Sequence, residues 1–193
     1  MKDLKKPRTA KSRARKYAAG DVQSVQSLNE EELAALFRAI HSPRDVALFA
    51  VSLNRGLRAS EVGLLQISDL RLSAKRLFVH RLKGGYSGEY PLTDQEVRAL
   101  RRWLAVRGTE PGPLFPSREG GAICRARLHG LMGEYATRAG LPESKRHFHC
   151  IRHTAGTMLC EKTDVADAKD RLGHRDIRST KKYVPGAPRG PSG

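Results

Sequence analysis

The sequence predicts an α+β fold that is mainly α-helical and carries one small antiparallel β-sheet. Three observations predict it. Apolar residues recur at helical spacing along most of the chain, and two of these segments begin with an Asn or Thr that has a Glu three residues later. One stretch alternates as a strand before a glycine-rich bend. At 193 residues, the chain is long enough for one domain with a substantial core.

Two helices are predicted at the start of the folded part. Asn29 and Glu32 have the spacing of a capping box, and one face of the helix that follows is apolar: Leu33, Leu36, Phe37 and Ile40. Ser42 and Pro43 open a second helix with its own apolar face: Val46, Phe49, Ala50 and Leu53. Gly56 is placed to end this second helix.

A short helix over residues 60–65 precedes the predicted sheet. Alternation over 77–82 and a second extended run over 89–92 flank a bend with three glycines. These runs predict a hairpin with Lys83 at its bend. One face of the first strand would hold Leu77, Val79 and Arg81.

The remaining predicted elements are helices. Thr93 and Glu96 repeat the capping-box spacing before another apolar face: Val97, Leu100, Trp103 and Leu104. Further helices are predicted over residues 125–139, 149–161, 164–172 and 176–184.

Charge and composition define the domain organisation and the class of partner. Lys plus Arg number 36 against 20 Asp plus Glu, which gives a net charge of +16 and indicates a polyanionic partner: nucleic acid first, an anionic membrane second. No apolar run approaches the roughly 18 residues of a membrane span, which excludes an integral membrane protein. Residues 1–23 are expected to be a basic disordered tail, 24–184 the folded domain and 185–193 a flexible end.

Cysteine and histidine usage argues against disulfides and metal sites. The three cysteines are Cys124, Cys150 and Cys160, an odd number without CxxC spacing, which indicates a reduced, intracellular compartment and no zinc ribbon. The histidines at 147, 149 and 153 have no Cys, Asp or Glu partner at ligand spacing, so no metal site is expected.

Two candidate sites lie in the first half of the chain. Arg58 follows Gly56 at the start of a helix, where backbone amides and a guanidinium can bind phosphate oxygens. The alternative is an ordinary surface pair between Arg58 and Glu61. Lys83, on the glycine-rich bend, would either reach a bound strand or be a solvated loop charge.

Two more candidate sites lie in the second half. His149 and Arg152 stand three residues apart on one helical face, with Ile151 turned toward the core. The alternative is a structural ion-binding or capping role for this pair. His174 ends a Leu-Gly-His turn, and Tyr183 follows nine residues later. Tyr183 could equally be an ordinary core tyrosine.

Together these motifs resemble the tyrosine recombinases, the integrase family, over roughly residues 28–184. The matching pieces are Gly-Leu-Arg-Ala-Ser-Glu, the Leu-Lys-Gly hairpin, His-x-x-Arg-His, and Leu-Gly-His followed by a Thr and a Tyr. They carry, in order, Arg58, Lys83, His149, Arg152, His174 and Tyr183. The chain is most similar to the small fimbrial phase-variation invertases of bacteria. This similarity rests on its short length and on two stretches, Val-His-Arg-Leu-Lys-Gly-Gly-Tyr-Ser and Leu-Gly-His-Arg-Asp-Ile-Arg-Ser-Thr.

The resemblance implies the tyrosine recombinase catalytic-domain fold and a site-specific DNA recombinase, with inversion, excision and integration as the possible outcomes. It makes Tyr183 the nucleophile that leaves a 3′-phosphotyrosyl intermediate. Arg58 and Arg152 would stabilise the transition state, and Lys83 would be the general acid. The resemblance implies proton transfer for His149 and a hydrogen bond to the phosphate for His174. The bond energy stays in the phosphotyrosine, so no ATP is expected. With four side-chain cations or donors around the phosphate, no metal ion or other cofactor is expected either.

The expected partner is double-stranded DNA, bound by a homo-tetramer on two DNA sites in the cytoplasm, at the nucleoid, and not by a membrane. Most members of the family carry an additional amino-terminal domain that closes around DNA, and here only the basic tail precedes the first helix. Accessory DNA-bending proteins would supply that function. The alternatives are a type IB topoisomerase-like enzyme, distinguished by plasmid relaxation against two-site recombination, and a catalytically silent DNA-binding regulator.

Overall fold

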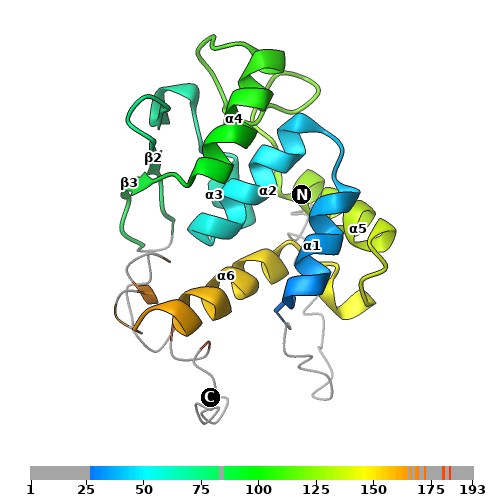
Figure 1. Cartoon of the computed structure of the whole chain (residues 1–193). Helices are drawn as coiled ribbons and strands as arrows, with labels where there is room; N and C mark the ends of the chain where they lie inside the picture. Colours follow the sequence, from blue (N-terminus) through cyan, green and yellow to red (C-terminus); the bar gives the residue numbers. More distant parts are fainter. Residues whose placement is uncertain are drawn as a thin grey trace, which may run out of the picture.

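The computed structural model describes residues 27–82 and 85–164, together with 166, 168, 169, 172, 180 and 183. The elements in this part of the chain are α1 (Glu30–Ala39), α2 (Pro43–Arg55), α3 (Ala59–Val62), η1 (Ile67–Asp69), β1 (Leu70–Arg71), β2 (Arg76–Val79), β3 (Gly88–Pro91), α4 (Asp94–Arg107), α5 (Arg125–Arg138), η2 (Glu143–Lys145) and α6 (His149–Lys162). The predicted mainly helical fold with a small antiparallel sheet is confirmed (Figure 1).

Both predicted capping boxes are present. At the start of α1, the Glu32 amide donates to Asn29 Oδ1 at 2.8 Å and the Asn29 amide donates to Glu32 Oε2 at 2.9 Å. At the start of α4, the corresponding contacts join Thr93 and Glu96 at 3.2 and 2.8 Å. Each cap satisfies amides that a helix start leaves without an intrahelical partner, a contribution of about 1 kcal/mol.

Gly56 ends α2, as predicted, in a backbone conformation that favours glycine. Its φ of 54° and ψ of 43° lie in the left-handed region. A Cβ at this position would also clash with Cδ2 of Leu172. The chain therefore turns tightly beneath Leu172.

The sheet has the order β1-β2-β3 with antiparallel pairs. Leu77, in the central strand, is opposite Leu70 of β1 and Tyr90 of β3. The predicted inward face is confirmed, because Leu77, Val79 and Arg81 are all buried. β1 was not predicted, since two residues carry too little pattern to be detected.

The predicted continuation of the first hairpin strand to Leu82 is wrong, because β2 ends at Val79. Beyond this point the backbone donates to side chains instead of to the next strand. The Arg81 amide donates to Ser87 Oγ at 2.9 Å, and the Leu82 amide donates to Glu61 Oε1 at 3.2 Å. The chain thus leaves the sheet to reach α3.

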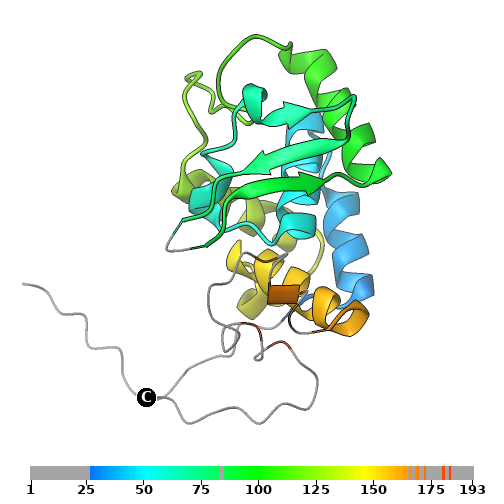
Figure 2. The same ribbon diagram turned by 90° about the vertical axis from the view of Figure 1, so that its left-hand side faces the viewer.

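The helices pack on one side of the sheet, and α2 lies between α4 and α6 (Figures 1 and 2). Phe49 of α2 meets the rings of Tyr135 and Phe148 edge-on at 5.9 and 5.7 Å. Trp103 of α4 is buried and donates from its indole Nε1 to the Leu114 carbonyl at 2.8 Å. The core therefore runs continuously from α4 through α2 to α6.

The other predicted helices are confirmed as far as the structure describes them. The helices predicted over 125–139 and 149–161 are α5 and α6, and α3 overlaps the helix predicted over 60–65. The segments 164–172 and 176–184 lie largely outside the described residues, as do the tail and the carboxyl-terminal end. No helix within the described part of the chain is both long and apolar enough to cross a membrane.

Candidate active site

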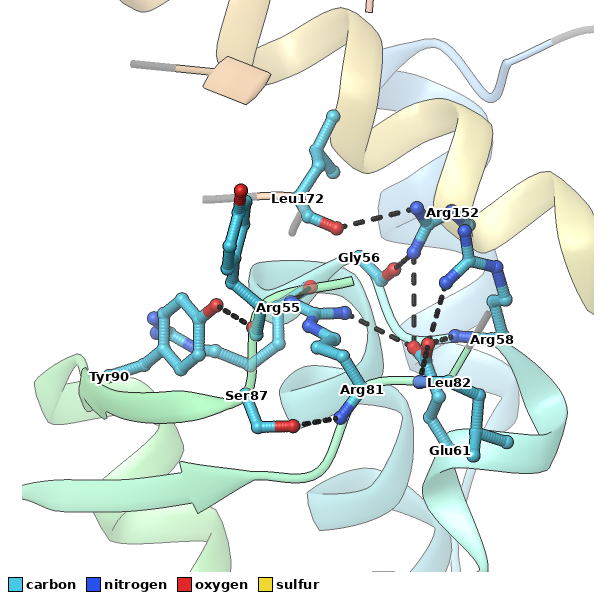
Figure 3. Close-up of polar contacts among 11 residues, drawn as sticks. Arg55, Gly56, Arg58, Glu61, Arg81, Leu82, Ser87, Tyr90, Arg152 and Leu172 are labelled. Carbon is cyan, nitrogen blue, oxygen red and sulfur yellow. Dashed lines mark hydrogen bonds and ion pairs between the residues drawn. The ribbon is translucent and has the colours of Figure 1, made fainter. Parts of the chain in front are cut away.

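Three guanidinium groups converge on one buried carboxylate, that of Glu61 in α3 (Figure 3). Glu61 Oε1 accepts from Arg58 Nη1 at 2.7 Å and from the Leu82 amide at 3.2 Å. Glu61 Oε2 accepts from the Arg58 amide at 2.9 Å and from Arg81 Nη1 at 3.2 Å, and it lies 3.9 Å from Arg152 Nη1. We call these four side chains the Glu61 cluster, and it keeps an excess of positive charge.

The alternative of an ordinary Arg58–Glu61 surface pair is therefore wrong in one respect: its carboxylate does not lie at the surface. The pair exists, but Glu61 is fully buried. Burial by itself would raise the pKa of the Glu61 carboxyl. The hydrogen bond from the Arg58 amide and the charges of Arg81 and Arg58 outweigh this effect, so the pKa lies below its ordinary value. Glu61 is thus an anion that orients the arginines around it.

Arg152, on α6, is held by backbone carbonyls as well as by Glu61. Its Nη1 donates to the carbonyl of Gly56 and its Nη2 donates to that of Leu172 at 3.4 Å. Burial, together with the nearby Arg58 charge, lowers the pKa of Arg152 to about 10. The group remains a cation at neutral pH, fixed in orientation before any ligand arrives.

Arg58 is the member of the Glu61 cluster that faces solvent. Its side chain is 27% exposed, whereas those of Arg152 and Arg81 are almost completely buried. It also stands at the position that caps α3. Arg58 can therefore contact an anion that arrives from solvent, while the enclosed Arg152 adds its fixed positive charge beside it.

Arg81 joins the hairpin to the Glu61 cluster, although it was not predicted to belong to the site. Its Nη2 donates to the Arg55 carbonyl at 2.7 Å, and its guanidinium lies 5.4 Å from the centre of the Tyr90 ring. The sequence did contain one indication of this role: Arg81 was predicted on the inward face of the strand, where a buried charged residue requires a partner.

Tyr183 lies against Arg152 and is only 6% exposed. Burial raises the pKa of its phenol, while the positive charges of Arg152 and Arg58 act in the opposite direction. The alternative of an ordinary core tyrosine is correct as to burial. Its neighbours, however, are a charged guanidinium and an imidazole instead of apolar side chains alone.

His149 lies at the exposed start of α6, and the ring of His153 lies between it and Tyr183. Its imidazole meets that of His153 at 4.6 Å between ring centres, and His153 meets the Tyr183 ring at 5.4 Å, both edge-on. Ile151 is fully buried, as predicted. His149 and Arg152 are neighbours on α6 but differ in exposure, since only Arg152 is enclosed. His153 was not predicted to belong to the site, and its spacing was used only to exclude a metal site.

The structure thus brings together Arg58, Arg152 and Tyr183, with His149 nearby. Lys83 and His174 lie outside the described residues. Within the described ranges, no group of three or more His, Cys, Asp or Glu is arranged to hold a metal ion. The assembled part of the site is a fixed cationic surface with one phenol beside it, which suits a phosphate group.

The fold and this arrangement define a class of protein. Residues 26–188 match the model of the phage integrase family, so the chain belongs to that family. The family places the chain among the tyrosine-type site-specific recombinases.

Among the relatives are two fimbrial proteins of Escherichia coli strain K12. The type 1 fimbriae regulatory protein FimB is 36% identical over 166 residues, which cover 81% of this chain and 82% of FimB. FimE is 32% identical over 167 residues, which cover 81% and 84%. The XerH site-specific recombinase bound to its difH substrate has a similar fold, with a TM-score of 0.71 at 24% identity. This match covers 82% of the present chain and 49% of the XerH chain.

Proposed function

We propose that this protein is a site-specific recombinase that cleaves and rejoins DNA strands through a 3′-phosphotyrosyl intermediate. The observation that carries the proposal is the placement of the Tyr183 phenol against Arg152, beside Arg58. A phosphodiester under attack gains negative charge on its non-bridging oxygens, and fixed cations next to them stabilise the transition state more than the ground state. The relatives support the same reaction, since they belong to this family.

In the proposed reaction, the Tyr183 oxygen bonds to phosphorus while the bond from phosphorus to the 5′ oxygen breaks. The phenol proton leaves with the help of His149, and Lys83 gives a proton to the departing 5′ oxygen. His174 donates a hydrogen bond to the phosphate. In the second half, a 5′-hydroxyl of another strand attacks the phosphotyrosine and releases Tyr183. One phosphodiester replaces another, so the exchange needs no ATP.

The proposed partner is double-stranded DNA, held by four copies of the chain on two sites in the nucleoid. The net charge of +16 supports a polyanionic ligand. Among the described residues, Arg58 offers a solvent-facing cation for the scissile phosphate. Accessory DNA-bending proteins belong to the same proposal.

Trapping on a nicked suicide substrate tests the nucleophile. Wild-type protein should give a covalent protein–DNA band that survives denaturation. Tyr183→Phe should give no band while binding the same DNA nearly as well, because one hydroxyl is lost and no cation is touched. Tyr86→Phe, at an exposed tyrosine, is the matched control and should retain the band. A band from Tyr183→Phe would assign the nucleophile elsewhere.

A second assay separates recombination from simple relaxation of DNA. A plasmid with two target sites is incubated with wild-type protein, and its topology and its sequence arrangement are both measured. A recombinase changes the arrangement of the segment between the sites. Relaxation without rearrangement would favour the topoisomerase-like alternative.

A further inference from the structure

Gly156 lies in the interior of α6, directly against the Tyr183 ring. A Cβ at this position would lie 2.6 Å from ring carbons Cδ2 and Cε2 and 2.7 Å from Cγ. Real Cβ atoms do not approach other heavy atoms so closely, so the ring occupies its position only because residue 156 has no side chain. A glycine in the interior of a helix makes the folded protein less stable than an alanine would, by roughly 0.5–1 kcal/mol. The space left by this glycine is filled by one ring.

Two other residues of α6 hold the same ring. His153, three residues before Gly156, meets the ring edge-on at 5.4 Å. Arg152 lies close enough to Tyr183 for its positive charge to act on the phenol. Residues within two turns of one helix therefore surround the ring: Gly156 and His153 pack against it, and Arg152 acts on its phenol through its charge.

We propose that Gly156 is a positioning residue that seats the Tyr183 ring so that its hydroxyl lies at Arg152. His153 forms the wall of this seat. The inference rests on the proposed function, because the seat has a catalytic meaning only if Tyr183 is the nucleophile. Displacing a reacting oxygen by about 1 Å can slow a reaction about 100-fold, so a single methyl group at residue 156 is enough to impair cleavage.

The chain offers a matched control for a methyl group on a helical glycine. Gly133 lies in α5, and a Cβ there meets no atom within 4 Å. Gly133→Ala and Gly156→Ala therefore make the same chemical change in two helices, and only the second affects the seat.

The first experiment needs no DNA. Purified protein is nitrated with tetranitromethane, and modification of each tyrosine is measured by peptide mass spectrometry. In the wild type, Tyr183 should be protected like Tyr135, which is also 6% exposed, and unlike Tyr86, which is 63% exposed. In Gly156→Ala, Tyr183 should approach the modification of Tyr86 while Tyr135 stays protected. Equal protection of Tyr183 in both proteins would overturn the seat.

The second experiment measures cleavage. Covalent trapping by Gly156→Ala should fall roughly 100-fold with DNA binding retained, while Gly133→Ala traps like wild type. If Tyr183 of the Gly156→Ala variant becomes open to nitration but the variant still traps DNA like wild type, the positioning role is refuted. If wild-type protein itself fails to trap DNA, the proposed function fails, whereas the nitration result still decides whether the seat exists.

A double-mutant cycle covers the case in which Gly156→Ala destabilises the whole domain. Urea unfolding is compared for wild type, Gly156→Ala, Tyr183→Ala and the double variant. The added methyl should destabilise the protein when the ring is present and stabilise it, through helix propensity, when the ring is removed. The same sign of effect in both backgrounds would show that the ring and residue 156 do not compete for space.

Discussion

Two fully buried glutamates, Glu96 and Glu61, show how differently one fold can use the same residue type. The Glu96 carboxylate accepts hydrogen bonds from Nε and Nη2 of Arg55 at 3.2 and 2.7 Å. It also accepts hydrogen bonds from the amide and hydroxyl of Thr93. One anion is matched there by one cation, and the pair fastens the end of α2 to the start of α4. Glu61 instead faces three guanidinium groups.

An excess of positive charge, more than burial, therefore distinguishes the candidate site from the scaffold. A matched buried pair has no capacity left for a ligand. The Glu61 cluster keeps positive charge that one carboxylate does not neutralise, and it exposes part of that charge through Arg58. A bound phosphodiester, which carries one negative charge, would offset part of this excess.

The largest expected effect concerns the matched pair. Glu96→Gln leaves the buried Arg55 guanidinium without its counter-charge, and breaking such pairs costs about 3–5 kcal/mol. Urea unfolding at neutral pH should show a loss of this size. Glu110→Gln, at an exposed position, should leave stability nearly unchanged. Trapping per folded molecule should be retained, and its loss would mean that Glu96 also serves the site.

The next effect concerns the unmatched cluster. Arg152→Ala removes a fixed cation from the proposed phosphate site and should slow cleavage at least about 100-fold, the scale for removing a preorganised contact to a transition state. Single-turnover cleavage on the suicide substrate measures it. Arg101→Ala, on the exposed face of α4, is the control of equal size. Cleavage within about twofold of wild type would make Arg152 structural.

The smallest effect is a pH dependence of stability. Because the pKa of Glu61 is lower in the folded protein than in the unfolded chain, folding is stabilised by its ionisation above the ordinary pKa, and this contribution is lost as pH falls through the folded pKa. Urea unfolding from pH 7 to pH 3 should show the stability gap between wild type and Glu61→Gln narrowing in acid. A gap that is constant with pH would contradict the ionised cluster. Glu30→Gln, at an exposed position, provides the baseline.

Sequence reasoning succeeded where cause and effect are close together in the chain. The caps at Asn29 and Thr93 and the end of α2 at Gly56 each depend on residues within one helical turn. The end of β2 was missed because it depends on Glu61 and Ser87, which lie elsewhere in the sequence.

The same limit applies to the site. The spacing of motifs and a family resemblance were enough to name Arg58, Arg152 and Tyr183, and the structure places these three together. The burial of Glu61 could not be predicted, because it follows from the meeting of three segments around residues 58, 81 and 152. Gly156 could not be recognised either, since its neighbour Tyr183 is distant in sequence.

Trp103 is the single tryptophan of the chain, and its buried indole gives the domain an intrinsic optical probe. The ring is 8% exposed on α4, which lies at the opposite end of the described helices from α6 (Figure 1). Its fluorescence emission should be blue-shifted in the folded protein and shift to longer wavelength when the domain unfolds. Changes confined to the Tyr183 seat should leave the emission of Trp103 unchanged. A Tyr86→Trp substitution would add an exposed indole, whose emission at longer wavelength would report on the hairpin.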